Sequence, residues 1–304
     1  MKIGMNENFM KLQERVLDSL ERTDWIKTKS ILSSIKGPTL VSGVGGSAVV
    51  SLFLSKVLSI KNSIICENVA ARDLIYRNLV CFKNIISCSY SGNNYGVVTS
   101  FDNNLNKYLL SKNLQNGVTN IRYSVTNTEE SFISLSSTLI PLSILLAYYL
   151  DNDIHIIEDI LNHTHDFYFD DLDIYEVLSG YDTSTASKFI ESTLSEAGIG
   201  IPIIHDKYDY CHGRSTLSHH YNSNLILLNS DSELDQLYDS IVDKYYGSVI
   251  KLNRKYDDDI VNDYYFTYLS MYLCQSIANK KKKDLSIVDY SPLVKKIYYF
   301  KGKM

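Results

Sequence analysis

The 304-residue sequence lacks several features that would place it in a class at once. No apolar run reaches the about 18 uncharged residues that a membrane-spanning helix needs, so we expect no membrane span. The formal net charge is −5, without the basic excess typical of nucleic-acid binding, and the lysines at 280–283 are interpreted as a solvated helix end. The N-terminus has no apolar signal-peptide segment and shows the pattern of an amphipathic helix.

The sequence also lacks a pattern for disulfides or metals. Its five cysteines are an odd number without a CxxC pair, which favours free thiols in a reducing cytoplasm. The histidine pairs His163/His165 and His219/His220 occur without further ligands at zinc spacing, so we expect no metal site.

Short β-branched apolar runs alternate with longer helical patterns, which predicts βαβ crossovers and a parallel sheet. In the first half we expect strands at 39–41, 63–66, 84–88 and 120–125, with helices at 47–59, 70–78, 95–113 and 129–150. The acidic stretch 151–180 is interpreted as helices and linker. In the second half we expect strands at 200–204, 224–228 and 247–252, with helices at 184–197, 212–220, 231–245 and 260–279. Pro202 predicts that the first of these strands is shorter than its pattern suggests.

Two small-residue loops follow strands of the first half. Gly43 to Ala48 satisfies G-x-G-x-x-A, and Glu67 stands where a dinucleotide ribose ligand would lie, so an NAD-binding domain is one interpretation. Ser47 at a helix N-terminus favours a compact phosphate instead. The second loop, SYSGNN at 89–94, supports the phosphate interpretation, because loops at the carboxyl ends of adjacent strands converge on one crevice.

The segments GVGGSAVVSLFLSKVL, IISCSYSGNNYGVV and IRYSVTN resemble the three signature segments of the sugar isomerase (SIS) domain. The second segment of that family usually reads S-x-S-G-x-T, and here Asn94 replaces the threonine. The resemblance implies that the substrate phosphate is bound by Gly45, Ser47, Ser89, Ser91 and Asn94.

In the second half, Glu196 precedes the His212-Gly213-Arg214 stretch by sixteen residues. An aldose–ketose isomerisation needs a carboxylate to move a proton between neighbouring carbons and an acid–base group for ring opening. Glu196 and His212 supply these two residue types, and Glu191 is the reserve candidate for the base.

The run LSEAGIGIPIIHDKYDYCHGR resembles the isomerase half of glucosamine-6-phosphate synthase, where a helix glutamate precedes an HG motif by the same spacing. The likeness continues into the tail, where it implies a lysine that assists ring opening. Spacing from Asp289 favours Lys296, and a displaced proline leaves Lys295 as the alternative. In related dimers the histidine enters the site from the partner subunit, so the resemblance also implies a homodimer.

The resemblance covers roughly residues 37–300 and implies an α/β fold of two tandem SIS-type, flavodoxin-like domains. We expect an N-terminal helical segment at 1–36, a first SIS domain at 37–165, a linker at 166–182, and a second SIS domain with the tail at 183–304. The chain begins Met-Lys-Ile-Gly, without the cysteine of the synthase's glutaminase, which favours a stand-alone enzyme.

The sequence thus predicts a cytoplasmic phosphosugar aldose–ketose isomerase, possible also on amino-sugar phosphates, that uses an enediol-type proton transfer without metal or redox cofactor. The alternatives are a deglycase acting on fructosamine phosphates at the same site and a non-catalytic regulatory protein that binds sugar phosphate. Which sugar is used stays open. Arg214 is expected to bind either a sugar oxygen or a surface carboxylate, Arg72 and Arg77 to form structural ion pairs, and Cys211 to be no nucleophile.

Overall fold

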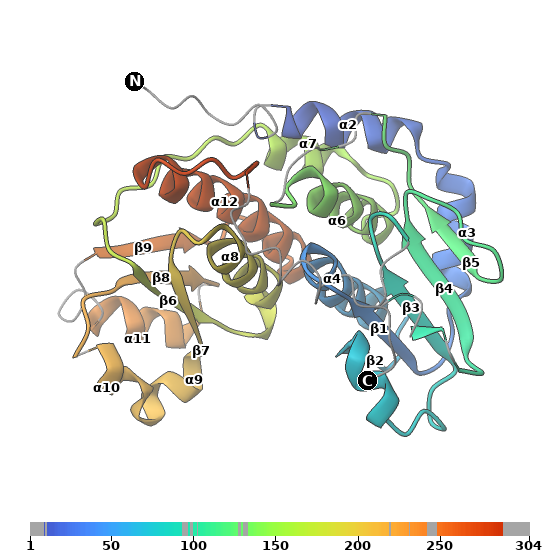
Figure 1. Ribbon diagram of the computed structural model, residues 1–304, viewed down its shortest axis with the longest axis horizontal. Helices are drawn as coiled ribbons and strands as arrows, with labels where there is room; N and C mark the ends of the chain where they lie inside the picture. Colours follow the sequence, from blue (N-terminus) through green and yellow to red (C-terminus); the bar gives the residue numbers. More distant parts are fainter. Residues whose placement is uncertain are drawn as a thin grey trace. The chain divides into compact units, whose positions relative to one another are not determined.

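The computed structural model describes residues 9, 11–92, 97, 100–101, 103–126, 129, 133–218, 220–230, 232–241 and 248–287. In this part of the chain, two parallel β-sheets are flanked by helices, so the fold is α/β (Figure 1). The chain divides into two compact units, one within Asn8–Ile157 and the other within Glu158–Leu285. The SIS-domain boundaries expected from the sequence stay a prediction.

The first sheet has five parallel strands in the order β2-β1-β3-β4-β5. Its strands are β1 (Thr39–Gly43), β2 (Cys66–Ala70), β3 (Asn84–Cys88), β4 (Asn106–Ser111) and β5 (Thr119–Arg122). The order reverses between β1 and β3, which is the flavodoxin-like arrangement. Strand β3 is buried along its whole length, as expected for a central parallel strand covered on both faces.

Helices cover both faces of this sheet. Figure 1 shows α4 and α6, which pack against each other, on one side and α3 on the other. Val16 and Leu20 of α2 and Leu32 of α3 are buried, so the predicted amphipathic N-terminal helix is confirmed as part of this unit's core. The helices are α2 (Leu12–Arg22), α3 (Trp25–Ser34), α4 (Gly46–Lys61), the 3-10 helix η1 (Ala71–Tyr76), α6 (Ser136–Tyr149) and α7 (His155–Leu161).

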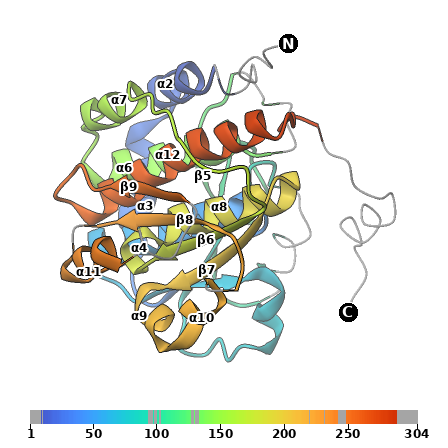
Figure 2. The same ribbon diagram turned by 90° about the vertical axis from the view of Figure 1, so that its left-hand side faces the viewer.

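The second sheet has four parallel strands in the order β7-β6-β8-β9. Helices α8 and α12 pack together on one side, and α11 lies on the other (Figures 1 and 2). The strands are β6 (Ile174–Ser179), β7 (Ile201–Asp206), β8 (Asn224–Asn229) and β9 (Ser248–Asn253). The helices are η2 (Tyr181–Thr183), α8 (Ser184–Ala197), α9 (Lys207–Asp209), the π-helical turn η3 (Tyr210–Arg214), α10 (Ser215–Ser218), α11 (Glu233–Ile241) and α12 (Asp259–Lys280).

Two strands lie where the sequence predicted other structure. Residues 174–179, expected to be linker or helix, form β6, the strand from which the order of the second sheet reverses. Residues 106–111, expected to continue a helix, form β4. Both strands carry polar residues beside their apolar ones, which hid them in patterns judged by apolar runs alone.

Smaller corrections concern the shape of single elements. Strand β7 spans six residues despite Pro202. In the described part of the chain it is an outer strand of its sheet, so a residue without an N–H can lie there with no loss of a hydrogen bond on the side that faces no other strand. The helix expected at 212–220 is a series of short helical turns from Lys207 to Ser218. Helix α6 begins at Ser136 rather than at residue 129.

Candidate functional site

The first loop connects β1 to α4 by a tight turn. A Cβ at Gly43 would lie 2.1 Å from the Ser47 carbonyl oxygen, so only glycine fits there. Gly45 is the N-cap residue of α4, with a φ of 60° and no side-chain cap hydrogen bond. The amides of Ser47 and Ala48 donate to the carbonyls of Val44 and Gly45 at 3.2 and 2.8 Å. Because these two amides are already hydrogen-bonded within the loop, the Ser47 hydroxyl is a better candidate donor to a phosphate than either of them.

The second loop, after β3, uses its two serines differently. Ser89 is buried, and its Oγ accepts a hydrogen bond of 3.0 Å from the Gly92 amide, which closes the turn. Gly92 has a φ of +75°, the left-handed conformation that glycine adopts without strain. Ser91 is exposed. Asn94 lies outside the described residues.

The end of β4 anchors this second loop from the side. Ser111 Oγ donates to the Tyr90 carbonyl at 3.2 Å, and Asn113 Nδ2 donates to the Ser91 carbonyl at 3.0 Å. The Lys112 ammonium lies 4.2 Å from the centre of the Tyr90 ring, in cation–π contact. The last residue of the missed strand β4 and the two residues after it thus hold the predicted phosphate loop in place.

Both loops leave the same edge of the first sheet. Strands β1 and β3 are parallel neighbours, and Gly43 at the end of one is the register partner of Cys88 at the end of the other. The strand order reverses between them, and this is where open α/β sheets bind ligands.

The candidate bases lie on α8 in the second unit. Glu196 is near the helix's C-terminal end, and its side chain is exposed at the surface. Partial desolvation by the surrounding protein nevertheless raises the pKa of the Glu196 carboxyl. The positive charge of Lys188 offsets part of this rise. Glu191, the reserve candidate, forms an ion pair of 2.6 Å with Lys188 one helical turn away.

His212 lies in the segment Tyr210–Arg214, which we call the histidine turn and in which the backbone kinks away from helical geometry at His212 and Gly213. Its imidazole is exposed, and the following Gly213 has a φ of 100°. Arg214 is also exposed and lies 3.9 Å from a carboxylate oxygen of Asp209, so it has a surface ion-pair partner. Lys295 and Lys296 lie outside the described residues.

The sequence-based interpretation missed two buried polar groups beside the histidine turn. One is Glu176 of β6, which is 1% exposed, together with His205 of β7. The other is an ion pair between Lys207 and Asp235, whose Nζ and Oδ1 are 2.5 Å apart. The signal for the first was a glutamate inside the apolar strand IYEVLS, where an unpaired charge is costly.

The residues behind the rival interpretations have other partners. Glu67, the ribose ligand of the NAD interpretation, accepts a hydrogen bond of 2.5 Å from Arg77. His163 Nε2 lies 2.6 Å from the ammonium of Lys255, which also pairs with Asp159 at 2.8 Å. Within the described ranges, no cluster of three or more His, Cys, Asp or Glu side chains is arranged to hold a metal ion. No helix in that part of the chain is both long and apolar enough to cross a membrane.

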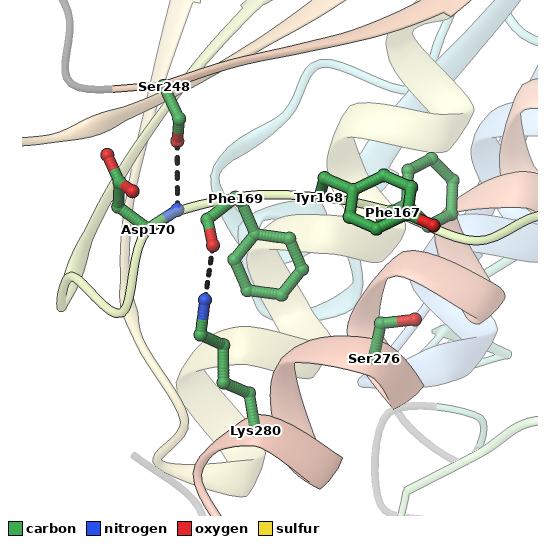
Figure 3. A pocket seen from close by; sticks show the side chains of 7 residues that line it. All are labelled: Phe167, Tyr168, Phe169, Asp170, Ser248, Ser276 and Lys280. Carbon is green, nitrogen blue, oxygen red and sulfur yellow. Dashed lines mark hydrogen bonds between the residues drawn. The ribbon is translucent and has the colours of Figure 1, made fainter.

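Two open cavities lie away from the predicted loops. One of about 510 Å³ lies in the second unit, where the Lys280 ammonium is 4.7 Å from the centre of the Phe169 ring (Figure 3). Its lining residues are Phe167, Tyr168, Phe169, Asp170, Ser248, Ser276 and Lys280. The other, of about 700 Å³, is lined by residues of 103–108 and 117–119, at the opposite ends of β4 and β5 from the two serine-containing loops. None of the predicted site residues that the structure describes lines either cavity.

Comparison with known proteins gives relatives in structure and none in sequence. No family model matches the chain, and no curated protein sequence matches it either. Among solved structures, the chain is similar to tagatose-6-phosphate ketose/aldose isomerase from Escherichia coli, with a TM-score of 0.72 and 13% identity over 94% of this chain and 96% of that one.

Two further structures have the same fold. The C-terminal domain of glucosamine-fructose-6-phosphate aminotransferase from Francisella tularensis has a TM-score of 0.68 and 14% identity, covering 94% of this chain and 99% of that one. Glucosamine-6-phosphate deaminase from Thermotoga maritima has a TM-score of 0.64 and 13% identity, covering 90% and 93%. At these identities the likeness shows the fold, a fold that phosphosugar isomerases share.

Proposed function

We propose that the protein is a phosphosugar aldose–ketose isomerase built from two tandem SIS-type domains. The observation that carries the proposal is the pairing of β1 with β3, because it brings the two serine-containing loops to neighbouring strand ends at the reversal of the sheet order. A phosphate monoester bound there would accept hydrogen bonds from the Ser47 and Ser91 hydroxyls. Gly45 would let the backbone approach it closely.

Helix N-termini elsewhere in the chain support this choice of loop. The amides of Thr185 and Ala186, at the start of α8, donate to the buried carboxylate of Asp263 at 3.2 and 3.3 Å. The start of α6 is likewise occupied by the carboxylate of Glu129, which accepts from Leu135 and its neighbours. Helix α4 begins instead at Gly45, which has no side chain to act as a carboxylate cap, so the positive end of its dipole can favour an anion bound through the Ser47 hydroxyl.

In the proposed reaction, Glu196 removes a proton from one carbon and returns it to its neighbour through an enediol. A raised pKa suits this task, since the carboxyl must both accept and release a proton near neutral pH. His212 and Lys296 assist ring opening and protonation of oxygen. The fold shared with phosphosugar isomerases supports this chemistry.

The test is a turnover assay on a panel of aldose and ketose phosphates of five and six carbons, amino sugars included, with the unphosphorylated sugars as controls. We expect interconversion of one aldose–ketose pair and none without the phosphate. Release of an amine from a fructosamine phosphate would identify the deglycase instead. Binding of phosphosugars without any turnover would replace the isomerase by the regulatory binding protein.

A further inference from the structure

A buried carboxylate lies beneath the connection between β7 and β8. Glu176 extends from β6, and its Oε2 accepts a hydrogen bond of 2.6 Å from Ser218. Its Oε1 accepts one of the same length from Ser223. His205 Nε2 approaches Oε2 to 3.2 Å, close enough for an ion pair although the ring is not aligned for a hydrogen bond.

This group reaches the histidine turn through one tyrosine. Tyr210 is the first residue of the turn, and its hydroxyl lies 2.8 Å from Ser218 Oγ. The Tyr210 ring also meets the His205 ring edge-on, with 5.1 Å between the ring centres. Tyr210 is therefore in contact with the buried group at both its hydroxyl and its ring.

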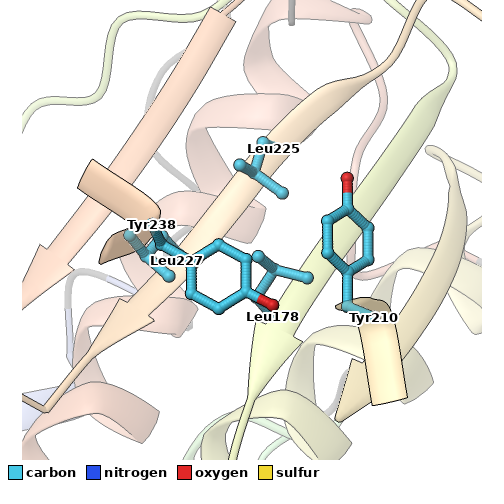
Figure 4. Packing of buried hydrophobic residues seen from close by; sticks show 5 residues of the cluster. All are labelled: Leu178, Tyr210, Leu225, Leu227 and Tyr238. Carbon is cyan, nitrogen blue, oxygen red and sulfur yellow. The ribbon is translucent and has the colours of Figure 1, made fainter. Parts of the chain in front are cut away.

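Tyr210 also anchors the turn in the apolar core. Figure 4 shows its ring among Leu178, Leu225, Leu227 and Tyr238, a cluster in which all five side chains are buried. The next four residues of the turn, 211–214, are exposed. The turn thus has one buried side chain beneath it, and the direction of that side chain fixes the backbone that carries His212.

Polar contacts of Tyr238 hold the other side of the turn. The Tyr238 hydroxyl donates to the Lys207 carbonyl at 2.5 Å, and Cys211 Sγ lies 3.1 Å from the same hydroxyl. Cys211 is exposed and directly precedes His212. The accessibility of this thiol therefore reports the conformation of the turn.

Stability alone is a poor reason to keep Glu176. An ionised group in a sheet interior is costly to desolvate, and apolar replacements of buried ion pairs are often neutral or stabilising. An apolar residue, however, cannot accept hydrogen bonds from hydroxyl groups and so cannot fix their orientation. Glu176 directs Ser218, and Ser218 holds the hydroxyl of Tyr210.

We propose that Glu176 is a positioning residue that acts through Ser218 and Tyr210 to hold the histidine turn in one conformation. The effect on catalysis rests on the proposed function, because that function gives His212 its role. The effect on the conformation of the turn does not depend on the proposed function. Ser223 provides a matched control, since it is also buried and bonds to the same carboxylate at the same distance, whereas the Tyr210 hydroxyl pairs with Ser218.

The experiment compares Tyr210→Phe and Ser218→Ala with Ser223→Ala. The first readout is the rate at which iodoacetamide alkylates Cys211, measured on its own peptide by mass spectrometry. Cys81, exposed and in the other unit, serves as the internal standard. We expect Tyr210→Phe and Ser218→Ala to change the Cys211 rate by about tenfold relative to Cys81, and Ser223→Ala to leave it unchanged.

The second readout is kinetic. If His212 has the proposed role, Tyr210→Phe should lower kcat about tenfold with little change in KM, and should have no further effect in a His212→Ala background. Unchanged alkylation in both test variants, or an equal change in Ser223→Ala, would overturn the positioning role. Altered alkylation in a protein whose wild type turns over no phosphosugar would leave positioning intact and refute the proposed function.

Discussion

Gly43 and Cys88 are register partners at the last positions of the neighbouring parallel strands β1 and β3. Two loops separated by more than forty residues in the sequence therefore begin side by side. This pairing underlies our proposal that Ser47 and Ser91 bind one ligand, which substitutions in this loop and in the second unit can test.

The two serines of the second loop should respond differently to substitution. Ser91→Ala should weaken binding of phosphorylated sugars by about 1–3 kcal/mol, the cost of a lost hydrogen bond to a charged group, and should lower thermal stability less than Ser89→Ala because Ser91 is exposed. Ser89→Ala should lower the melting temperature, because the Gly92 amide loses its acceptor. Calorimetric titration and thermal unfolding measure the two effects, and an unchanged affinity in Ser91→Ala would argue against the phosphate site.

Substitution of the proposed base should separate binding from chemistry. Glu196→Gln should abolish turnover and leave phosphosugar affinity nearly intact, because the amide keeps the shape but cannot accept the proton. Glu191→Gln tests the reserve assignment on the same helix. Retained turnover in Glu196→Gln would exclude that residue as the base, and loss in Glu191→Gln alone would transfer the role.

The pH dependence of catalysis should reflect the raised pKa of Glu196. A base must be deprotonated to act, so kcat/KM should fall as the pH drops through that pKa. Because the pKa is raised, this fall should occur at a higher pH than for an ordinary glutamate. A profile of kcat/KM against pH measures the fall, and a fall at the pH of an ordinary glutamate would contradict a raised pKa for the base.

Glu176 should contribute to stability in a pH-dependent way. Burial opposes ionisation of its carboxyl, but His205, Ser218 and Ser223 outweigh it and hold the pKa below the ordinary value of 4.5. A depressed folded-state pKa gives a contribution that is present above the unfolded-state pKa and lost as the pH falls through the folded-state pKa.

Glu176→Gln should therefore be less stable than the wild type at pH 7, by about 1–3 kcal/mol, with a difference that shrinks in acid. Urea unfolding across this pH range measures the free energy of unfolding for both proteins. A difference that stays constant with pH would show that folding does not shift the pKa of this carboxyl, and one that grows in acid would show that folding raises it.

Much of the fold could be predicted from the sequence because it is encoded in local patterns. Strands β1, β3 and β8 contain apolar runs, and α8 ends at Gly198 in the left-handed conformation, as its glycine predicts. Strands β4 and β6 were missed because Lys107 and Glu176 interrupt their apolar pattern. In β6 that interruption is itself the polar group beneath the histidine turn.

The site could be predicted only in part, for a related reason. The loops containing Ser47 and Ser91 have recognisable local patterns, whereas Glu176 acquires its partners from residues 29 to 47 positions away, which only the tertiary fold brings together. The different tasks of Ser89 and Ser91 likewise depend on backbone geometry that residue types do not specify.

Pro202 has a consequence for how copies of this protein meet. An outer strand presents unpaired amides and carbonyls to which a strand from another molecule could add. In β7 the proline removes one of the amides on which such a ladder depends. Pro202 therefore disfavours edge-to-edge polymerisation through β7 without removing a hydrogen bond within the second sheet.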